Sequence, residues 1–406
     1  MALSRVLWIL LVLLPELIEG QSKKLACSYE HPRALNAGYR PDYIPVELCT
    51  HVIFKAFAFP RSVGRQMVFD DTDKAAFSQL VSAVRKRSNT VRVVASIDGS
   101  HYEYSIVSGV NVRRRAFVQA VGTLLLELDA DAVEINWIQN GGYSPEKLSS
   151  YASDRMTKVI LLQDLRQIVM AANKRLDGRN RELWFRGSIH QGVIDASYNV
   201  FDICDVVDHV TLEAMNIRFT MSHAPINGTV ESSDRKGVPT RLDDTGSSIT
   251  DGTIRWINDG CPQKKLLLGM AFFGIVKNYT HSSRTFFGPS YSTWGAFFKG
   301  IVSYRELCLS LSEPGWTIGW DKYGMMPYAL RELPHGEDEI MSYDDVTSLR
   351  YKMDLVQDKR LGGVYVDYVH WDDIYARCGQ AYPLTSYVAY RLQSIQSDIG
   401  FAIEWS

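Results

Sequence analysis

The sequence lacks a strong charge bias, because 44 Lys and Arg residues nearly balance 46 Asp and Glu residues, for a formal net charge of -2 over 406 residues. It therefore gives no electrostatic reason to expect nucleic acid or an anionic membrane surface as a partner. Low-complexity runs are also missing, and the 46% hydrophobic and 22% charged residues are typical of a globular protein.

Long apolar runs are missing beyond the N-terminus, where no stretch reaches the ~18 apolar residues of a membrane-spanning helix. The first 20 residues combine a basic Arg5, an apolar run from Val6 to Leu14 and a small residue at Gly20, which is the pattern of a secretory signal peptide. We therefore predict a signal peptide at 1–20 and a mature chain at 21–406 that is secreted, extracellular and without a membrane span. An uncleaved anchor is the alternative.

Cysteine is scarce, and its spacing lacks the close pairs of a zinc site, so we expect neither a metal nor another cofactor. An even number of cysteines in an oxidising compartment favours disulfides, although spacing alone does not choose among the many pairings. Two sequons, at Asn227 and Asn278, predict glycosylation on surface loops. The six cysteines are Cys27, Cys49, Cys204, Cys261, Cys308 and Cys378.

Short runs rich in β-branched and aromatic residues alternate with longer segments of helical periodicity, such as 74–87 and 155–176. Eight such runs separated by helices predict an α/β fold of the (β/α)8 TIM barrel type. A doubly wound sheet is the competing fold, but no Gly-rich turn follows the first strand to hold a phosphate. The runs are KLACSY, THVIFKAFAF, VRVVASI, AVEINW, LWFRGSI, HVTLEAM, KLLLGMAFF and GGVYVDYV.

One interval, from the seventh run to SYDDVTSLRYKM at 342, is too long for a simple loop. It is rich in Tyr, Trp, Gly and Pro and contains strand-like patches. A structureless loop of this length is improbable inside a compact domain, so the interval predicts an inserted subdomain.

The order of these segments resembles that of the family 18 glycoside hydrolases, the chitinases and chitinase-like proteins. The resemblance covers residues 24–389 and rests on VVASIDG, DAVEINW, and SYDD followed by LGG and then DD with Cys-Gly-Gln. It implies a barrel with a small α+β insertion subdomain after strand 7, at 275–341. It also implies disulfides between Cys27 and Cys49 and between Cys308 and Cys378, which leaves Cys204 for Cys261.

Active family members carry Asp-Gly-x-Asp-x-Asp-Trp-Glu on the fourth strand, and the resemblance lays this motif on residues 131–138, from Asp131 to Ile138. The final Glu protonates the glycosidic oxygen, the substrate's N-acetyl group is the nucleophile, and the preceding Asp orients that group. Here Ile138 stands at the acid and Asn136 at the orienting Asp. Strand alternation places Glu134, Asn136 and Ile138 on the barrel interior. Because Ile138 has no proton to donate, the chemistry is lost.

The sixth strand independently lacks residues that the same reaction requires. Active members read Met-Thr-Tyr-Asp there, whereas HVTLEAMNI puts Met215 at the Tyr and Asn216 at the Asp. Glu213 shares the face of Met215 and is a candidate for a relocated acid. We favour instead a paired interior network, because a buried unpaired carboxylate is costly. That network would contain Glu134, Glu213, Arg186 and Asp367.

The tryptophans on which active members stack sugar rings are also missing. Asp367 replaces the Trp at the end of the eighth strand, which forms the floor of the central subsite, and Ser28 replaces a cleft Tyr. Three further tryptophan positions carry Pro32, Ser100 and Met221. The remaining tryptophans are expected to pack in the core or the insertion, and they include Trp256, Trp294, Trp316, Trp320 and Trp371.

We therefore interpret the chain as a secreted, catalytically inactive, monomeric chitinase-like protein that acts by recognition. It would resemble the growth-factor-like or immune-responsive members known from insects and other animals. Its partner would be an extracellular protein or cell-surface receptor, with weak glycan binding at most. A weak glycan lectin is the alternative, followed by a hydrolase with Glu134 or Glu213 as a relocated acid.

Overall fold

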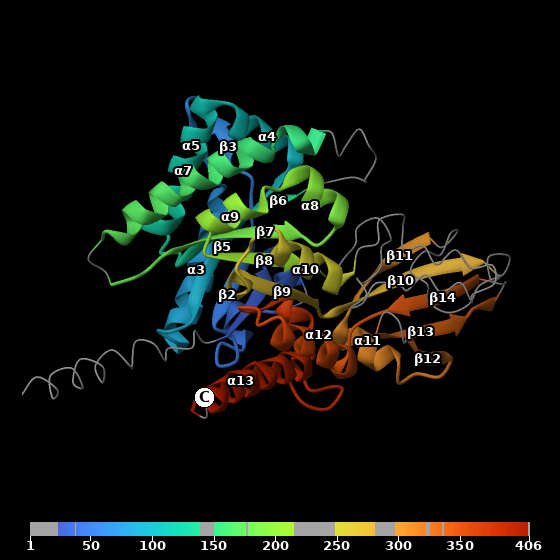
Figure 1. Cartoon of the computed structure of the whole chain (residues 1–406). Helices are drawn as coiled ribbons and strands as arrows, with labels where there is room; N and C mark the ends of the chain where they lie inside the picture. The colour runs from blue at the N-terminus through green and yellow to red at the C-terminus, as the bar shows by residue number, and fades with distance from the viewer. Residues whose placement is uncertain are drawn as a thin grey trace, which may run out of the picture.

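A closed barrel of eight parallel strands, in the order β1-β15-β9-β8-β7-β6-β5-β2, forms the centre of the protein (Figure 1). The computed structural model describes residues 23–36, 38–138, 150–175, 178–214, 248–280, 297–321, 325–334 and 337–404. Each of the eight predicted strand runs overlaps one strand of the barrel, which confirms the TIM-barrel prediction. The strands are β1 (Lys24–Glu30), β2 (His51–Ala58), β5 (Arg92–Ser100), β6 (Ala132–Ile138), β7 (Glu182–Ser188), β8 (His209–Glu213), β9 (Leu266–Ala271) and β15 (Gly363–Asp367).

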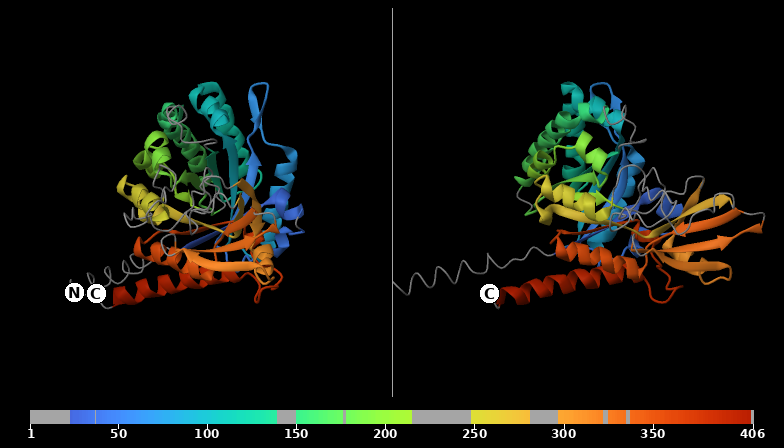
Figure 2. Two further views of the ribbon diagram at one scale, coloured as in Figure 1. Left: turned by 90° about the vertical axis from the view of Figure 1, so that its right-hand side faces the viewer. Right: turned by 45° about the vertical axis from the view of Figure 1, so that its right-hand side comes forward.

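Helices cover the outside of the barrel, as Figure 2 shows. Helix α3 (Asp71–Arg87) illustrates why they form, because the Asp70 side chain accepts a hydrogen bond from the Thr72 amide and Phe77 is fully buried. The other barrel helices are α4 (His101–Gly109), α5 (Asn111–Leu126), α7 (Arg155–Asn173), α8 (Gln191–Ser197), α9 (Val200–Val206), α10 (Ile249–Asn258), α12 (Val346–Asp358) and α13 (Pro383–Glu404). In the described part of the chain, no helix is both long and apolar enough to cross a membrane.

Short elements complete the loops. They are helix α2 (His31–Asn36), the hairpin of β3 (Arg61–Val63) and β4 (Gln66–Val68), and the 3-10 turns Pro41–Tyr43, Gln263–Lys265 and Val369–Trp371.

A five-stranded antiparallel sheet with one helix follows β9, the seventh barrel strand, and projects from one side of the barrel (Figure 2). This confirms the insertion predicted after strand 7. The sheet runs from Phe273 to Ser342, so it begins two residues before the predicted segment at 275 and ends one residue after 341. Its elements are β10 (Phe273–Thr280), β11 (Phe297–Ser303), α11 (Tyr304–Ser310), β12 (Trp316–Asp321), β13 (Met326–Glu332) and β14 (Glu337–Ser342).

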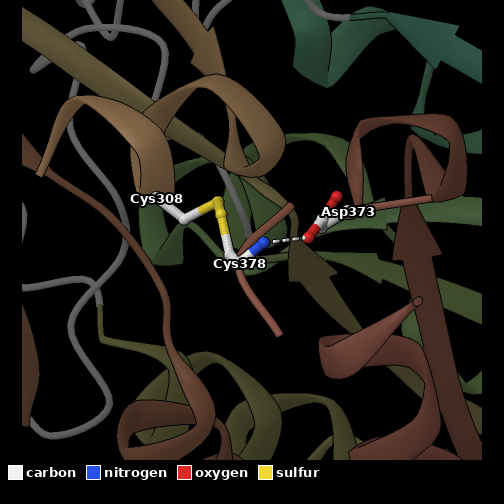
Figure 3. Close-up of side chains that lie close together, drawn as sticks. All are labelled: Cys308, Asp373 and Cys378. Carbon is white, nitrogen blue, oxygen red and sulfur yellow. Dashed lines mark hydrogen bonds between the residues drawn. A yellow bond between two sulfur atoms is a disulfide. The ribbon is translucent and has the colours of Figure 1, made fainter. Parts of the chain in front are cut away.

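Three disulfides join Cys27 to Cys49, Cys204 to Cys261 and Cys308 to Cys378, the pairings that the resemblance implies. The third links α11 of the insertion to the segment after β15, beside the Asp373 carboxylate that accepts the Cys378 amide at 2.7 Å (Figure 3). Cys308, Cys378 and Asp373 are close enough together to be considered as metal ligands. Both sulfurs are bonded to each other, so this cluster is a structural crosslink.

An apolar layer separates the two ends of the barrel interior. Trp184 of β7 is fully buried there, and its indole N–H donates to Glu182 at 2.8 Å. Buried polar groups lie on both sides of this layer, with Glu182 on the amino side and Glu134, Arg186 and Asp367 on the carboxyl side. The layer is formed by Ala26, Ile53, Val94, Ala132, Trp184, Leu267 and Tyr365.

Candidate functional site

Glu134 lies fully buried in the middle of β6, where side chains from three other barrel strands contact its carboxylate. Ser96 Oγ of β5 donates at 2.6 Å, Arg186 Nη2 of β7 donates at 2.8 Å, and Thr211 Oγ1 of β8 donates to the other oxygen. Such charge-assisted bonds are stronger than neutral ones. Glu134 is therefore held as a paired carboxylate, as the predicted interior network requires.

Arg186 extends this network toward β15. Its guanidinium carbon lies 4.5 Å from the ring centre of Tyr365, which in turn donates a hydrogen bond to Asp367. Burial works against the charge of Arg186, but Glu134, Tyr365 and Asp367 outweigh this and hold its pKa well above the usual value. Arg186 stays a cation that needs its buried acidic partners.

Asp367 stands where the resemblance places the missing floor tryptophan, and it is paired with Lys55 of β2. The Lys55 ammonium lies 2.9 and 3.2 Å from the two carboxylate oxygens, and Ser28 Oγ donates to one of them at 3.2 Å. Burial tends to raise the pKa of Asp367, but Lys55 and Arg186 outweigh it and lower that pKa. An ion pair thus occupies the end of the eighth strand.

Asn136 donates from its amide nitrogen to Asp98 Oδ1 at 2.7 Å, across the pairing of β6 with β5. Burial raises the pKa of Asp98, while Lys55 and Arg186 act in the opposite direction. The sequence analysis missed both Asp98 and Lys55. The alternation of Ser96, Asp98 and Ser100 along β5 was the available signal for Asp98, because it puts three polar side chains on one face.

Other predicted positions are spread more widely. Asp131 precedes β6 at the amino end of the barrel, where it pairs with Arg85 and accepts the Val93 amide at 2.7 Å, far along the strand from Asn136. Glu213 is half-buried at the end of β8, two residues beyond the Thr211 that contacts Glu134. Ile138 is the last residue of β6, opposite Ser100. Met215, Asn216, Met221, Asn227 and Trp294 lie outside the described residues.

One placement was wrong: Asn278 lies in strand β10, between β11 and β14, not on a loop. A sequon is read from three residues, whereas strand pairing depends on distant partners.

Ser100 and Pro32 stand at two positions where active family members carry tryptophans. Ser100 caps α4, and Pro32 lies in α2. Trp256 is buried and donates to the Ser188 carbonyl at 2.9 Å, which agrees with core packing.

Tyr368 forms an aromatic group beside the carboxyl end that the sequence analysis also missed. Its ring centre lies 4.5 Å from that of Trp371 and 6.0 Å from that of Phe273. Two cations lie over the ring, with Lys55 Nζ at 4.8 Å and Arg33 Cζ at 5.6 Å from its centre. The Tyr368 ring therefore already lies against aromatic and cationic side chains of the protein itself.

His370 links this end of the barrel to the stability of the fold at low pH. It is fully buried, and burial lowers its pKa from 6.5 to about 3. Below pH 6.5 the unfolded chain binds a proton that the folded chain does not, so the free energy of unfolding falls by about 1.4 kcal/mol per pH unit from this group. The loss continues down to the folded pKa of about 3.

We therefore expect His370→Phe to reduce the acid sensitivity of the protein. Urea unfolding between pH 6.5 and 4 should show a shallower loss of stability in this variant, by about one bound proton. His31→Phe is the control, because His31 is only partly buried and its pKa is lowered less strongly. Equal pH slopes for wild type and His370→Phe would contradict the prediction.

Comparisons with known proteins show which proteins this chain is similar to. The model of glycosyl hydrolases family 18 matches residues 28–369. The chain is 24% identical to an endochitinase of Manduca sexta over 86% of its length and 23% identical to a probable endochitinase of Caenorhabditis elegans over 87%. It spans only 64% and 57% of the lengths of these two relatives. It is 21% identical to human chitinase-3-like protein 2, covering 96% of this chain and 97% of that protein.

Solved structures agree on the fold. The Group IV chitinase of Ostrinia furnacalis superposes with a TM-score of 0.74 at 21% identity, over 91% of this chain and all of that one. Human YKL-39, described as a pseudo-chitinase with retained chitooligosaccharide binding properties, superposes with a TM-score of 0.73 at 18% identity, over 92% of this chain and all of that one. The fold is thus similar to that of a chitinase and of a pseudo-chitinase.

Proposed function

Because the chain belongs to family 18 of the glycosyl hydrolases, whose model matches residues 28–369, we propose that it is a non-catalytic member that acts by recognition outside the cell. The carrying observation is Ile138 at the end of β6, the position at which active members have their acid. A hydrocarbon side chain cannot protonate a leaving group. The neighbouring Asn136 amide is engaged by Asp98 rather than kept for an acetamido group.

The interior network also supports a non-catalytic function. Glu134 accepts bonds from Ser96, Thr211 and Arg186, so acid catalysis by this carboxyl would require it to leave a buried ion pair. Leaving a buried charge without its partner typically costs about 3–5 kcal/mol. That cost argues against Glu134 as a relocated acid.

Protein recognition is the form of binding that we favour. The Asp367–Lys55 ion pair stands at the position of the sugar-stacking floor, and both Lys55 and Arg33 lie over the Tyr368 ring. An apolar sugar face would meet charges there instead of an open aromatic surface. We infer a secreted monomer that binds an extracellular protein or a cell-surface receptor, in a growth-factor-like or immune role. The three disulfides are consistent with an oxidising compartment.

A weak glycan lectin is the second candidate. It is favoured by the similarity to YKL-39, whose description states retained chitooligosaccharide binding. Asp98, Asn136 and Lys55 offer hydrogen-bonding groups that a sugar could use.

Calorimetry with N-acetylglucosamine tetramer and hexamer tests the two candidates. We expect dissociation constants no tighter than about 1 mM, because the rings find no aromatic floor from which to displace water. A low-micromolar constant that is lost in Asn136→Ala, with the exposed Tyr102→Ala on α4 as a neutral control, would favour the lectin. Absence of binding would leave the outer surface and loops as the recognition site.

A further inference from the structure

A pocket of about 770 Å³ opens at the amino end of the barrel, at the opposite end from the Glu134 network. Its walls include Lys24, His51, Arg92 and Glu182, which are the first residues of β1, β2, β5 and β7. The segment after α3 completes its rim. This volume lies within the ~300–1,000 Å³ range of small-molecule sites.

Two arginine–glutamate ion pairs lie in the lining of this pocket. Arg87 Nη2 lies 3.0 Å from Glu47 Oε2, and Arg87 also donates to the Ile44 carbonyl at 2.6 Å. Arg92 is paired with Glu182, which also accepts the Trp184 indole N–H at 2.8 Å. Both acidic side chains of the lining are therefore already neutralised by an arginine.

Lys24 is the remaining cation of the lining. It is half-buried, and within the described part of the chain its ammonium group makes neither a hydrogen bond nor an ion pair. Burial lowers its pKa and Arg92 adds to this, while Glu182 and the more weakly acting Asp208 partly offset it. A partly desolvated ammonium group without a partner is unfavourable, and an anion in the pocket would relieve it.

His51 gives a second, independent indication of a ligand site. His51 lines the pocket, is 4% exposed as a residue, and has Nδ1 2.9 Å from Thr50 Oγ1. The other nitrogen, Nε2, is buried without a hydrogen-bond partner among the described residues, since Glu182 is 3.9 Å away. Burial, Arg92 and His209 hold the pKa of His51 well below its usual value, and Lys24 adds to this. The positive charges of Arg92 and Lys24 therefore already disfavour protonation of the neighbouring His51.

We propose that this pocket binds a small molecule through an oxyanion, a carboxylate or phosphate group, with Lys24 Nζ as its ionic partner. A half-buried ammonium group with no hydrogen bond or ion pair of its own among the described residues, beside two arginine–glutamate pairs, suits a ligand that brings negative charge. Hydroxyl groups of Ser88 and Thr90 at the rim supply further hydrogen bonds. The site is independent of the carboxyl end and of the proposed recognition function.

Calorimetry on the intact secreted protein tests the site, with inorganic phosphate and glucuronate as probes at constant ionic strength. We expect dissociation constants below about 1 mM for at least one probe, and no heat from neutral N-acetylglucosamine. Lys24→Met should weaken binding at least about tenfold, whereas Lys24→Arg should retain it. Lys264→Met is the matched control, since it removes an exposed lysine from the 3-10 turn Gln263–Lys265, which precedes β9.

A second measurement needs no variant. Trace acetylation of the native protein, followed by peptide mass spectrometry, should show phosphate or glucuronate protecting Lys24 but not Lys264. Binding that is equal in Lys24→Met and wild type, or protection absent at Lys24, would mean an adventitious ion only and would overturn the proposal. No binding of either probe up to about 10 mM would overturn it as well.

Discussion

Fluorogenic chitobiose and chitotriose are expected to release their fluorophore at the buffer rate when incubated with this protein, from acid to neutral pH. The reason is Ile138 at the end of β6, because loss of a general acid alone typically costs about 10² to 10⁴-fold in rate. Loss of the acetamido-orienting carboxylate at Asn136 lowers the rate further. A fluorescence assay with an active chitinase as positive control makes the measurement.

Restoring one group should not restore turnover. In Ile138→Glu, Asn136 would still be bonded to Asp98, and Asp367 would still be paired with Lys55. Two variants, Glu213→Gln and Asp98→Asn, test whether another carboxyl group acts as the acid. Both are assayed beside a mock purification. Wild-type turnover that disappears in either variant but is absent from the mock preparation would show that the protein is an enzyme.

Arg186→Met is expected to destabilise the fold by about 3–5 kcal/mol, because it leaves the Glu134 carboxylate buried without its cation. The Glu134 and Arg186 side chains are 0% and 2% exposed, so water cannot take the place of the missing partner. Urea unfolding at neutral pH measures the loss as a fall in the transition midpoint with little change in slope.

The control is Arg255→Met, which removes a guanidinium from a 38% exposed side chain that lies 2.7 Å from Asp195 and 2.8 Å from Asp259. A surface pair of this kind contributes about 0–1 kcal/mol. The double variant Glu134→Gln with Arg186→Met should recover part of the stability, since it removes both charges together. A loss in Arg186→Met no larger than in Arg255→Met would show that the interior network does not stabilise the barrel.

The strands and the inward face of β6 could be predicted because they follow from local patterns. Alternation along DAVEINWI places Glu134 and Asn136 on the same side, and the structure has both in hydrogen bonds across the barrel interior. The disulfide pairings were not readable from spacing. They followed from the resemblance, and the structure contains all three.

The sequence by itself determined the eight barrel strands, the insertion after the seventh, and the residue at each motif position. Only the tertiary structure decided the partners: Lys55 for Asp367 across 312 residues, Asp98 for Asn136 across 38, and the pocket around Lys24. The physical reason is that periodicity records how neighbouring residues share a face, whereas an ion pair depends on the register of strands brought together by barrel closure. A charged residue's position can therefore be read from the chain, but its partner cannot.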